Sequence, residues 1–366
     1  MALSQGTPKA REVIDRMFGI AVDQGASDLH LVVGKPPILR MGGELAPISG
    51  AAVLTAENVK QLCYSILSDQ ERERFITEKE LDVAHQIASG KRFRINLHWE
   101  KGHVAMAART IPSVIPRMED LDMPPIAHDM VNYPHGLVLV TGPTGAGKST
   151  TLASMIDKIL HTQAVNVITL EDPVEFMFES KLGIVRQRQF GQDFISFDDG
   201  LKHILRQDPD VVMVGEMRDM ETISTTLTIA ETGHLVFATL HTYSASQTID
   251  RLIDAFPAHQ QNQVRTQLAL TLRAIVSQQL LPKVGGGRVA AREILVNNYA
   301  TANLIRDSKI QQINNVLQTS AAEGMTTLRQ DLKRLVEMNL ITEQVAEEHI
   351  VGGSKLDENG GSKKKK

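Results

Sequence analysis

The sequence predicts a mixed α/β chain of two domains, an α+β module followed by a parallel α/β domain with helices after it. Three observations support this fold class. Alternating apolar and polar residues mark the first part, apolar strands separated by helix-like stretches mark the second, and a proline-rich segment divides them. With 366 residues, of which 42% are hydrophobic, the chain is long enough for each part to bury a core.

The amino-terminal module is expected to span residues 1–110. Residues 9–24 carry apolar side chains at helical spacing and predict an amphipathic helix. Strand patterns follow: SDLHLVVG alternates, and PPILRMGGEL contains a two-glycine turn suited to a hairpin. The stretch SGKRFRINLHWEKGHVAMAART predicts two further strands that meet around Lys101 and Gly102.

Residues 111–125 are expected to link the two domains. The segment TIPSVIPRMEDLDMPP contains four prolines, which resist helix and sheet alike. Beyond it, the patterns predict the core of the parallel α/β domain at residues 126–290, a helical region at 291–352 and a disordered tail at 353–366, where DENGGSKKKK is of low complexity.

Composition excludes several classes of protein. The 39 basic and 43 acidic residues leave a net charge of −4, so there is no basic excess to favour nucleic acid as a partner. The single cysteine, Cys63, excludes an internal disulfide framework and a Cys-X-X-Cys zinc module. Since no secretory signal is recognisable and no apolar run reaches the roughly 18 residues of a membrane span, a cytoplasmic location is expected.

The segment LVLVTGPTGAGKSTTLASMIDKIL at residues 137–160 predicts a strand, a glycine-rich loop and a helix. Its loop fits the pattern G-x-x-x-x-G-K-[ST], in which backbone amides surround phosphates at a helix amino terminus. The lysine then neutralises the β- and γ-phosphates, and the serine hydroxyl binds Mg²⁺. The phosphate-binding set predicted here consists of Pro143, Thr144, Gly145, Ala146, Gly147, Lys148, Ser149 and Thr150, with Ser149 also a metal ligand.

Three later strands are followed by polar residues. VNVITLEDPVEF ends in acids, DVVMVGEMRD ends in Glu216, and GHLVFATLHT is bracketed by His234 and His241. The carboxyl ends of parallel strands meet at one edge of a sheet, where an acid can hold Mg²⁺ or orient an attacking water. His241 is well placed to sense a γ-phosphate. Each of these residues taken alone could equally be a helix cap or a solvated loop side chain.

These motifs resemble a known family. GPTGAGKSTTLA, ITLEDPVEF, LRQDPDVVMVGEMRD and AETGHLVFATLHT are similar, in order and spacing, to the Walker A, Asp box, Walker B and His box of type II/IV secretion ATPases. The similarity is greatest to pilus retraction ATPases of the PilT type. The segments GASDLHL and PPILRMGGEL resemble the PAS-like domain of that family. The resemblance implies a PAS-like α+β domain followed by a RecA-like P-loop ATPase domain with carboxyl-terminal helices.

The resemblance also implies roles for site residues. Lys148 and Ser149 would bind the phosphates of ATP and Mg²⁺, and Glu175 of the Asp box would be the base that orients water. Glu216 would support Mg²⁺ in the Walker B, although the motif ends in glycine and glutamate, which leaves open which acid touches the metal. The His box would comprise His234 and His241.

Family members form hexameric rings in which arginines complete the nucleotide site between a subunit's domains. An arginine finger can contribute about 10³ to 10⁵ in rate. The alternative for each arginine is a surface salt bridge. The candidates are Arg92, Arg94 and Arg109 in the first domain, and Arg206 and Arg251 in the second.

The carboxyl-terminal helices carry a further resemblance. The segment ATANLIRDSKI is similar to the AIRNLIRE motif of the retraction ATPases, although Thr301 replaces its arginine and Asp307 its final glutamate. The alternative is an ordinary packed helix start. Leu328, Leu332 and Leu335 have the spacing of core residues.

The function implied is a hexameric motor that hydrolyses ATP to power type IV pilus retraction and twitching motility. Its expected partners are an inner-membrane platform protein, the pilin machinery and PilU-like or PilB-like ATPases, at the inner face of the cytoplasmic membrane. Assembly ATPases usually add an amino-terminal region and a four-cysteine zinc module, which this sequence lacks. The alternatives are an accessory or scaffold ring with low turnover and a nucleic-acid translocase of RecA-like fold.

Overall fold

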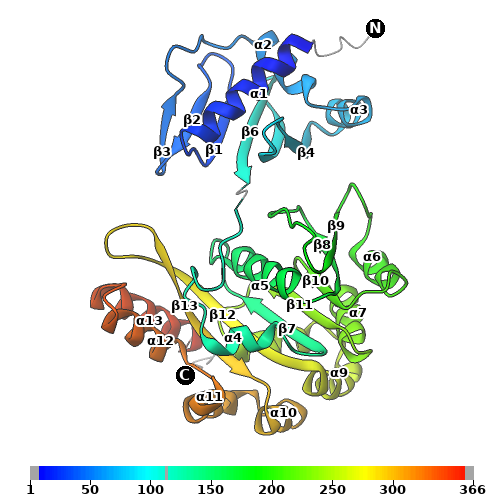
Figure 1. Ribbon diagram of the computed structural model, residues 1–366, viewed down its shortest axis with the longest axis vertical. Helices are drawn as coiled ribbons and strands as arrows, with labels where there is room; N and C mark the ends of the chain where they lie inside the picture. The colour runs from blue at the N-terminus through cyan, green and yellow to red at the C-terminus, as the bar shows by residue number, and fades with distance from the viewer. Residues whose placement is uncertain (1–7, 112–113, 359–366) are drawn as a thin grey trace, which may run out of the picture. The chain divides into compact units, whose positions relative to one another are not determined.

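The chain divides into two compact units, Met1–Val114 and Ile115–Lys366 (Figure 1). The computed structural model describes residues 8–111 and 114–358. Residues 112 and 113 of the expected linker therefore lie outside the described residues, as do residues 359–366 of the expected tail. Each unit has its own hydrophobic core.

The first unit is a six-stranded antiparallel sheet with three helices. Its strand order is β3-β2-β1-β6-β5-β4. The amphipathic helix predicted at residues 9–24 is confirmed as α1, which buries Ile14 and Phe18. The strands are β1 (Asp28–Leu31), β2 (Ile38–Met41), β3 (Glu44–Pro47), β4 (Glu80–Gln86), β5 (Arg92–Glu100) and β6 (His103–Ile111), and the helices are α1 (Pro8–Asp23), α2 (Ala56–Ser65) and α3 (Asp69–Glu78).

Both predicted hairpins of this unit are confirmed. Gly42 and Gly43 join β2 to β3 with φ angles of 57° and 96°, and Lys101 and Gly102 join β5 to β6 with φ angles of 52° and 80°. Two consecutive positive φ angles suit the twist of an antiparallel pair. Helices α2 and α3 and strand β4 were not predicted from the sequence, although capping boxes begin both helices.

The second unit contains a seven-stranded sheet in the order β13-β12-β7-β11-β10-β8-β9. All neighbouring pairs are parallel except β12 with β13. Residues 291–296 belong to β13, so the sheet extends beyond residue 290, where a helical region was expected, because β13 pairs with β12 along its whole length. The strands are β7 (Gly136–Thr141), β8 (Asn166–Glu171), β9 (Ile184–Gln189), β10 (Val211–Val214), β11 (Leu235–Leu240), β12 (Leu272–Pro282) and β13 (Arg288–Val296).

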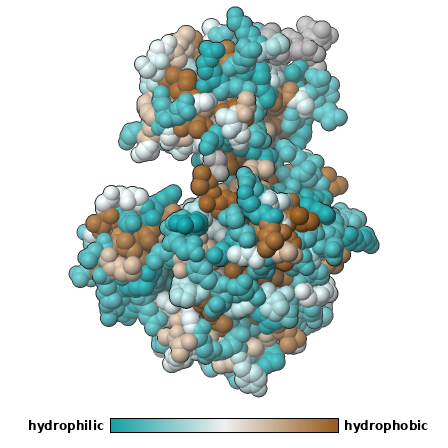
Figure 2. Space-filling model, viewed as in Figure 1, coloured by the Kyte–Doolittle hydropathy of each residue, from teal (hydrophilic) through white to brown (hydrophobic). Residues whose placement is uncertain are grey.

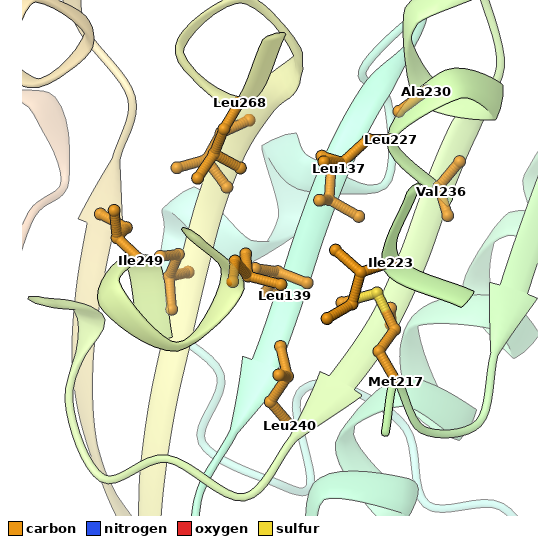
Figure 3. Packing of buried hydrophobic residues seen from close by; sticks show 14 of the residues in the cluster. Leu137, Leu139, Met217, Ile223, Leu227, Ala230, Val236, Leu240, Ile249 and Leu268 are labelled. Carbon is orange, nitrogen blue, oxygen red and sulfur yellow. The ribbon is translucent and has the colours of Figure 1, made fainter. Parts of the chain in front are cut away.

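Helices cover both faces of this sheet. The side chains of β7 alternate, so Leu137 and Leu139 pack against helices on one face, where Figure 3 shows them beside residues of α7, α8 and α9. Val138 and Val140 pack on the other face in a cluster that includes residues of α4 and α5. The helices are α4 (Pro125–Met130), α5 (Lys148–Thr162), α6 (Phe197–Ile204), α7 (Met220–Glu231), α8 (Ala245–Asp254) and α9 (Ala258–Thr271).

The carboxyl-terminal helices pack in two places. Helices α12 and α13 pack at the edge of the sheet formed by β12 and β13, whereas α10 and α11 join the core on the face covered by α8 and α9. Leu332 and Leu335 are buried against the β12–β13 pair, and Leu328 is partly buried, as the spacing predicted. Residues 353–358 are helical, whereas a disordered tail was expected from 353 onward, because α13 continues to Glu358. These helices are α10 (Tyr299–Arg306), α11 (Ile313–Thr319), α12 (Leu328–Glu337) and α13 (Glu343–Glu358).

The surface of the molecule in the view of Figure 2 is mostly hydrophilic, with small apolar patches. Over the described residues, 8–111 and 114–358, no helix is both long and apolar enough to cross a bilayer. This agrees with the absence of a long apolar run in the sequence.

We expect Leu139→Ala to lower the free energy of unfolding by about 2 to 5 kcal/mol, because Leu139 is fully buried between the sheet and its helices. Urea denaturation followed by circular dichroism measures the change. The matched control is Ile195→Ala, since Ile195 is 86% exposed and its replacement should cost less than about 0.5 kcal/mol. Equal effects of the two substitutions would contradict the packing described here.

Candidate nucleotide-binding site

Some of the polar residues that the sequence singles out lie at one edge of the sheet. Strands β7, β11, β10 and β8 are parallel neighbours, so their carboxyl ends lie side by side. The glycine-rich loop follows β7, His241 follows β11, and Glu216 follows β10. Ligands of parallel α/β sheets bind at this edge.

The glycine-rich loop is shaped by close packing. Gly142 has a φ of +146°, and a Cβ atom there would collide with the carbonyl oxygen of Gln278 on β12. Gly147 has a φ of +85° and directly precedes α5, which begins at Lys148. The first amides of a helix have no intrahelical acceptor and can donate to a phosphate. The structure thus places residues 143–150, the predicted phosphate-binding set, at the turn from β7 into α5.

Gln278 supports the loop from the neighbouring strand, and it was not among the residues predicted from the sequence. Its Nε2 donates to the carbonyl oxygen of Ala146 at 2.7 Å, and its Oε1 accepts a bond from Thr151 Oγ1 at 3.0 Å. The residue is 2% exposed. The sequence did contain a signal, because three polar residues, Ser277, Gln278 and Gln279, interrupt the apolar run of β12, and buried polar groups need specific partners.

Lys148, His241 and Glu216 form a continuous chain of contacts. Lys148 Nζ donates to the carbonyl oxygens of Gly142 at 2.7 Å and Pro143 at 3.2 Å, and it lies 3.4 Å from His241 Nδ1. His241 Nε2 lies 3.3 Å from Glu216 Oε1. An ammonium group only donates, so Nδ1 is the acceptor and Nε2 carries the proton directed at the carboxylate.

Burial and charge act against each other at this site. Burial lowers the pKa of Lys148, and the charges of Glu216 and Glu175 partly oppose that shift. For Glu216, burial acts to raise the pKa, but the hydrogen bond and charge of Arg218 and the proximity of His241 outweigh it, so the pKa is lowered. The geometry therefore favours the ionised form of Glu216, which a metal ligand requires.

Arg218 is a second residue of the site that was not predicted from the sequence. Its guanidinium contacts Glu216 Oε2 at 3.0 Å and Asp172 Oδ2 at 3.5 Å. It therefore joins the acid that follows β10 to the loop that follows β8. The sequence contained a signal for this contact. Arg218 lies two positions after Glu216, and a carboxylate that is partly buried needs a counter-charge close by.

The acids at the carboxyl end of β8 and in the loop after it differ in environment. Glu171 is buried, which raises its pKa, and it accepts bonds from Thr169 Oγ1 at 2.7 Å and Gln187 Nε2 at 3.0 Å. Its other oxygen accepts the amide of Glu175 at 3.4 Å. Glu171 thereby orders the loop that carries Glu175, whose own side chain is exposed.

Two predicted site residues lie at the opposite edge of the sheet. His234 precedes β11, and its ring bonds the carbonyl oxygen of Ile229 at 3.1 Å, about 20 Å along the strand from His241. Arg206 precedes β10, and the turn that follows it bonds the Asn166 side chain at the amino end of β8. Within one subunit neither residue reaches the phosphate loop, because each lies before its strand rather than after it.

The remaining arginines occupy other surfaces. Arg251 is exposed on α8. In the first unit, Arg94 and Arg109 face each other across β5 and β6, and Arg109 Nε donates to Asp28 Oδ1 at 3.0 Å. Arg92 begins β5. Their proposed contacts with nucleotide remain predictions.

The fold and the loop define a class, the P-loop nucleotide-binding proteins with a parallel α/β sheet. A family model described as type II/IV secretion system protein matches residues 117–351. The chain belongs to this family. The resemblance stated from the motifs is thereby confirmed.

Individual relatives agree with this assignment. The chain is 45% identical over 335 residues to the type IV pilus retraction ATPase PilT of Pseudomonas aeruginosa, covering 92% of this chain and 97% of that protein. It is 46% identical to a twitching motility protein of Neisseria gonorrhoeae, over 85% of this chain and 83% of the relative. A crystal structure of the pilus retraction motor PilT with bound ADP superposes with a TM-score of 0.87 at 44% identity, covering 92% of this chain and 96% of that one.

We expect Arg218→Gln to move the acidic limb of the pH profile of ATP hydrolysis to higher pH. Arg218 lowers the pKa of Glu216, so its loss raises that pKa, and the carboxylate then becomes protonated sooner as the pH falls. Measurement of kcat/KM across pH tests this. Arg329→Gln, an exposed position on α12, is the control and should leave the profile unchanged. An unshifted acidic limb in Arg218→Gln would contradict the assignment.

Proposed function

We propose that this chain is the subunit of a ring-shaped motor that hydrolyses ATP to drive retraction of type IV pili. The observation that carries the proposal is the contact chain from Lys148 through His241 to Glu216, at the edge where the phosphate loop lies. The similarity to PilT over nearly the whole chain supports the pilus as the load.

The residues of the site suit a triphosphate with Mg²⁺. Ser149 follows Lys148 in the first turn of α5, and its hydroxyl together with the Glu216 carboxylate supplies the oxygen ligands that Mg²⁺ prefers. Bound Mg²⁺ would neutralise charge on the phosphate oxygens during transfer. Phosphoryl transfer depends mainly on positioning and charge, which the loop amides and Lys148 provide.

His241 is suited to sense the terminal phosphate. In the described arrangement Lys148 Nζ donates to two loop carbonyls and to His241. Phosphate oxygens are stronger acceptors than carbonyls, so bound ATP competes for the ammonium group. The His241–Glu216 contact then changes with the occupancy of the site, and hydrolysis can be converted into movement.

The similarity to PilT also supports a proposal for the assembly and the location. We propose a homohexamer that acts at the inner face of the cytoplasmic membrane, where an inner-membrane platform protein and the pilin machinery receive its movement. PilU-like or PilB-like ATPases would be further partners. The arginines of the first unit and of α8 would act as fingers, since an arginine supplied to the γ-phosphate stabilises the transition state.

We expect Glu175→Gln to slow ATP hydrolysis by about 10² to 10⁴ while ATP affinity stays within about twofold of wild type. The substitution removes the proposed base and leaves the phosphate loop intact. Single-turnover hydrolysis and equilibrium titration with a fluorescent ATP analogue measure the two quantities. Glu179→Gln is the control, because Glu179 is exposed in the same segment and pairs with Lys181. Equal losses of affinity and rate in Glu175→Gln would refute its role as the base.

The motor function is tested in cells that lack the gene. The intact chain should restore pilus retraction, and Lys148→Ala, which removes the loop cation, should not. Purified wild-type protein should hydrolyse ATP at least about tenfold faster than Lys148→Ala. If retraction persists with Lys148→Ala, the chain is an accessory ring instead. Equal hydrolysis by both proteins would exclude an ATP-driven motor.

A further inference from the structure

Two neighbouring residue pairs on the antiparallel strands β12 and β13 connect the phosphate loop with other parts of the second unit. Ser277 faces Glu293, and Gln278 faces Arg292, in the register of the two strands. Strand β12 is also the parallel neighbour of β7, which leads into the phosphate loop. The pairs therefore link the outer strand β13 to β12, which lies beside the strand that leads into the phosphate loop.

The members of these pairs on β12 contact the phosphate loop and its strand. Gln278 bonds Ala146 in the loop and Thr151 in α5. Ser277 Oγ lies 2.8 Å from Thr141 Oγ1, at the last residue of β7. Three side-chain hydrogen bonds thus join β12 to the phosphate loop, to α5 and to the end of β7.

Arg292 on β13 contacts the segment that precedes α4. The residue is 3% exposed, and its two terminal nitrogens donate to the carbonyl oxygens of Asp122 at 3.0 Å and Leu121 at 2.8 Å. Its backbone amide donates to Asp331 Oδ2 at 2.7 Å. Arg334 pairs with Asp331 at 2.7 Å and with Asp122 at 2.8 Å.

Glu293, the next residue on β13, contacts helix α8. Its carboxylate accepts the amide of Ala245 at 2.8 Å, at the start of α8. Ala245 lies four residues after His241, which contacts Lys148. The outer strand is thus connected to the phosphate site by two routes, one through Gln278 and one through the start of α8.

We propose that Arg292 is a positioning residue that couples occupancy of the phosphate loop to the end of the interdomain linker at residues 118–123. Paired strands keep their register, so a shift of Gln278 carries Arg292 with it. The planar guanidinium of Arg292 donates to the carbonyl oxygens of two successive residues, Leu121 and Asp122, a geometry that an ammonium group cannot reproduce. This proposal rests on the proposed function, since it states how events at the ATP site reach the segment that leads to the amino-terminal unit.

Hydrogen exchange of the full-length protein, with and without ADP and Mg²⁺, tests the coupling. The amides of residues 120–123 make hydrogen bonds within the segment, so their exchange reports its local opening. In the wild type we expect ADP to change their exchange rates by at least about threefold. Arg292→Lys should lose most of this response while its ADP affinity stays within about threefold of wild type. Arg288→Lys, at an exposed position on the same strand, should keep the full response.

A full response in Arg292→Lys, or no response in the wild type, would overturn the proposal. If Arg292→Lys does not fold, Arg292→Met provides a second variant. Methionine fills much of the buried volume of Arg292 without a charge and without the two donors to the carbonyl oxygens of Leu121 and Asp122, so the response should again be lost. The readout needs only ADP binding, so a protein that bound ADP but failed to drive retraction would refute the proposed function and leave the coupling intact.

Discussion

The buried ammonium group of Lys148 constrains the rest of the nucleotide-binding unit. A cation that is removed from water needs acceptors close by, and here two loop carbonyls and His241 supply them. Those acceptors come from the turn after β7 and from the end of β11, so the site exists only when the two strands are neighbours. The carboxylate of Glu216, after the next strand, completes the charge balance.

Close packing shapes the phosphate loop. Gly142 lies against the carbonyl oxygen of Gln278 with no room for a side chain, and the Gln278 amide holds the loop carbonyl of Ala146. The conformation of the loop thus depends on contacts with strand β12 as well as on its own glycines. A loop shaped in this way before the nucleotide binds helps to position the phosphates, which is a main requirement of phosphoryl transfer.

The two units were predictable to different degrees. Hairpins and amphipathic helices depend on neighbouring residues, so alternation and the glycine turns revealed α1, β2, β3, β5 and β6. Helices α2 and α3 were missed although their capping boxes are local signals. The addition of β13 to the sheet was also missed, because pairing of strands depends on contacts that composition does not encode.

The sequence by itself determined the phosphate loop, the strand that precedes it and the polar residues that follow β8, β10 and β11, because each is a short pattern with a local physical cause. Only the tertiary structure decided which of the polar residues meet. It brought His241 to Lys148 and placed His234 at the far edge of the sheet, and it added Arg218 and Gln278. The reason is that strand order brings together residues that are far apart in the chain, and no local pattern records that order.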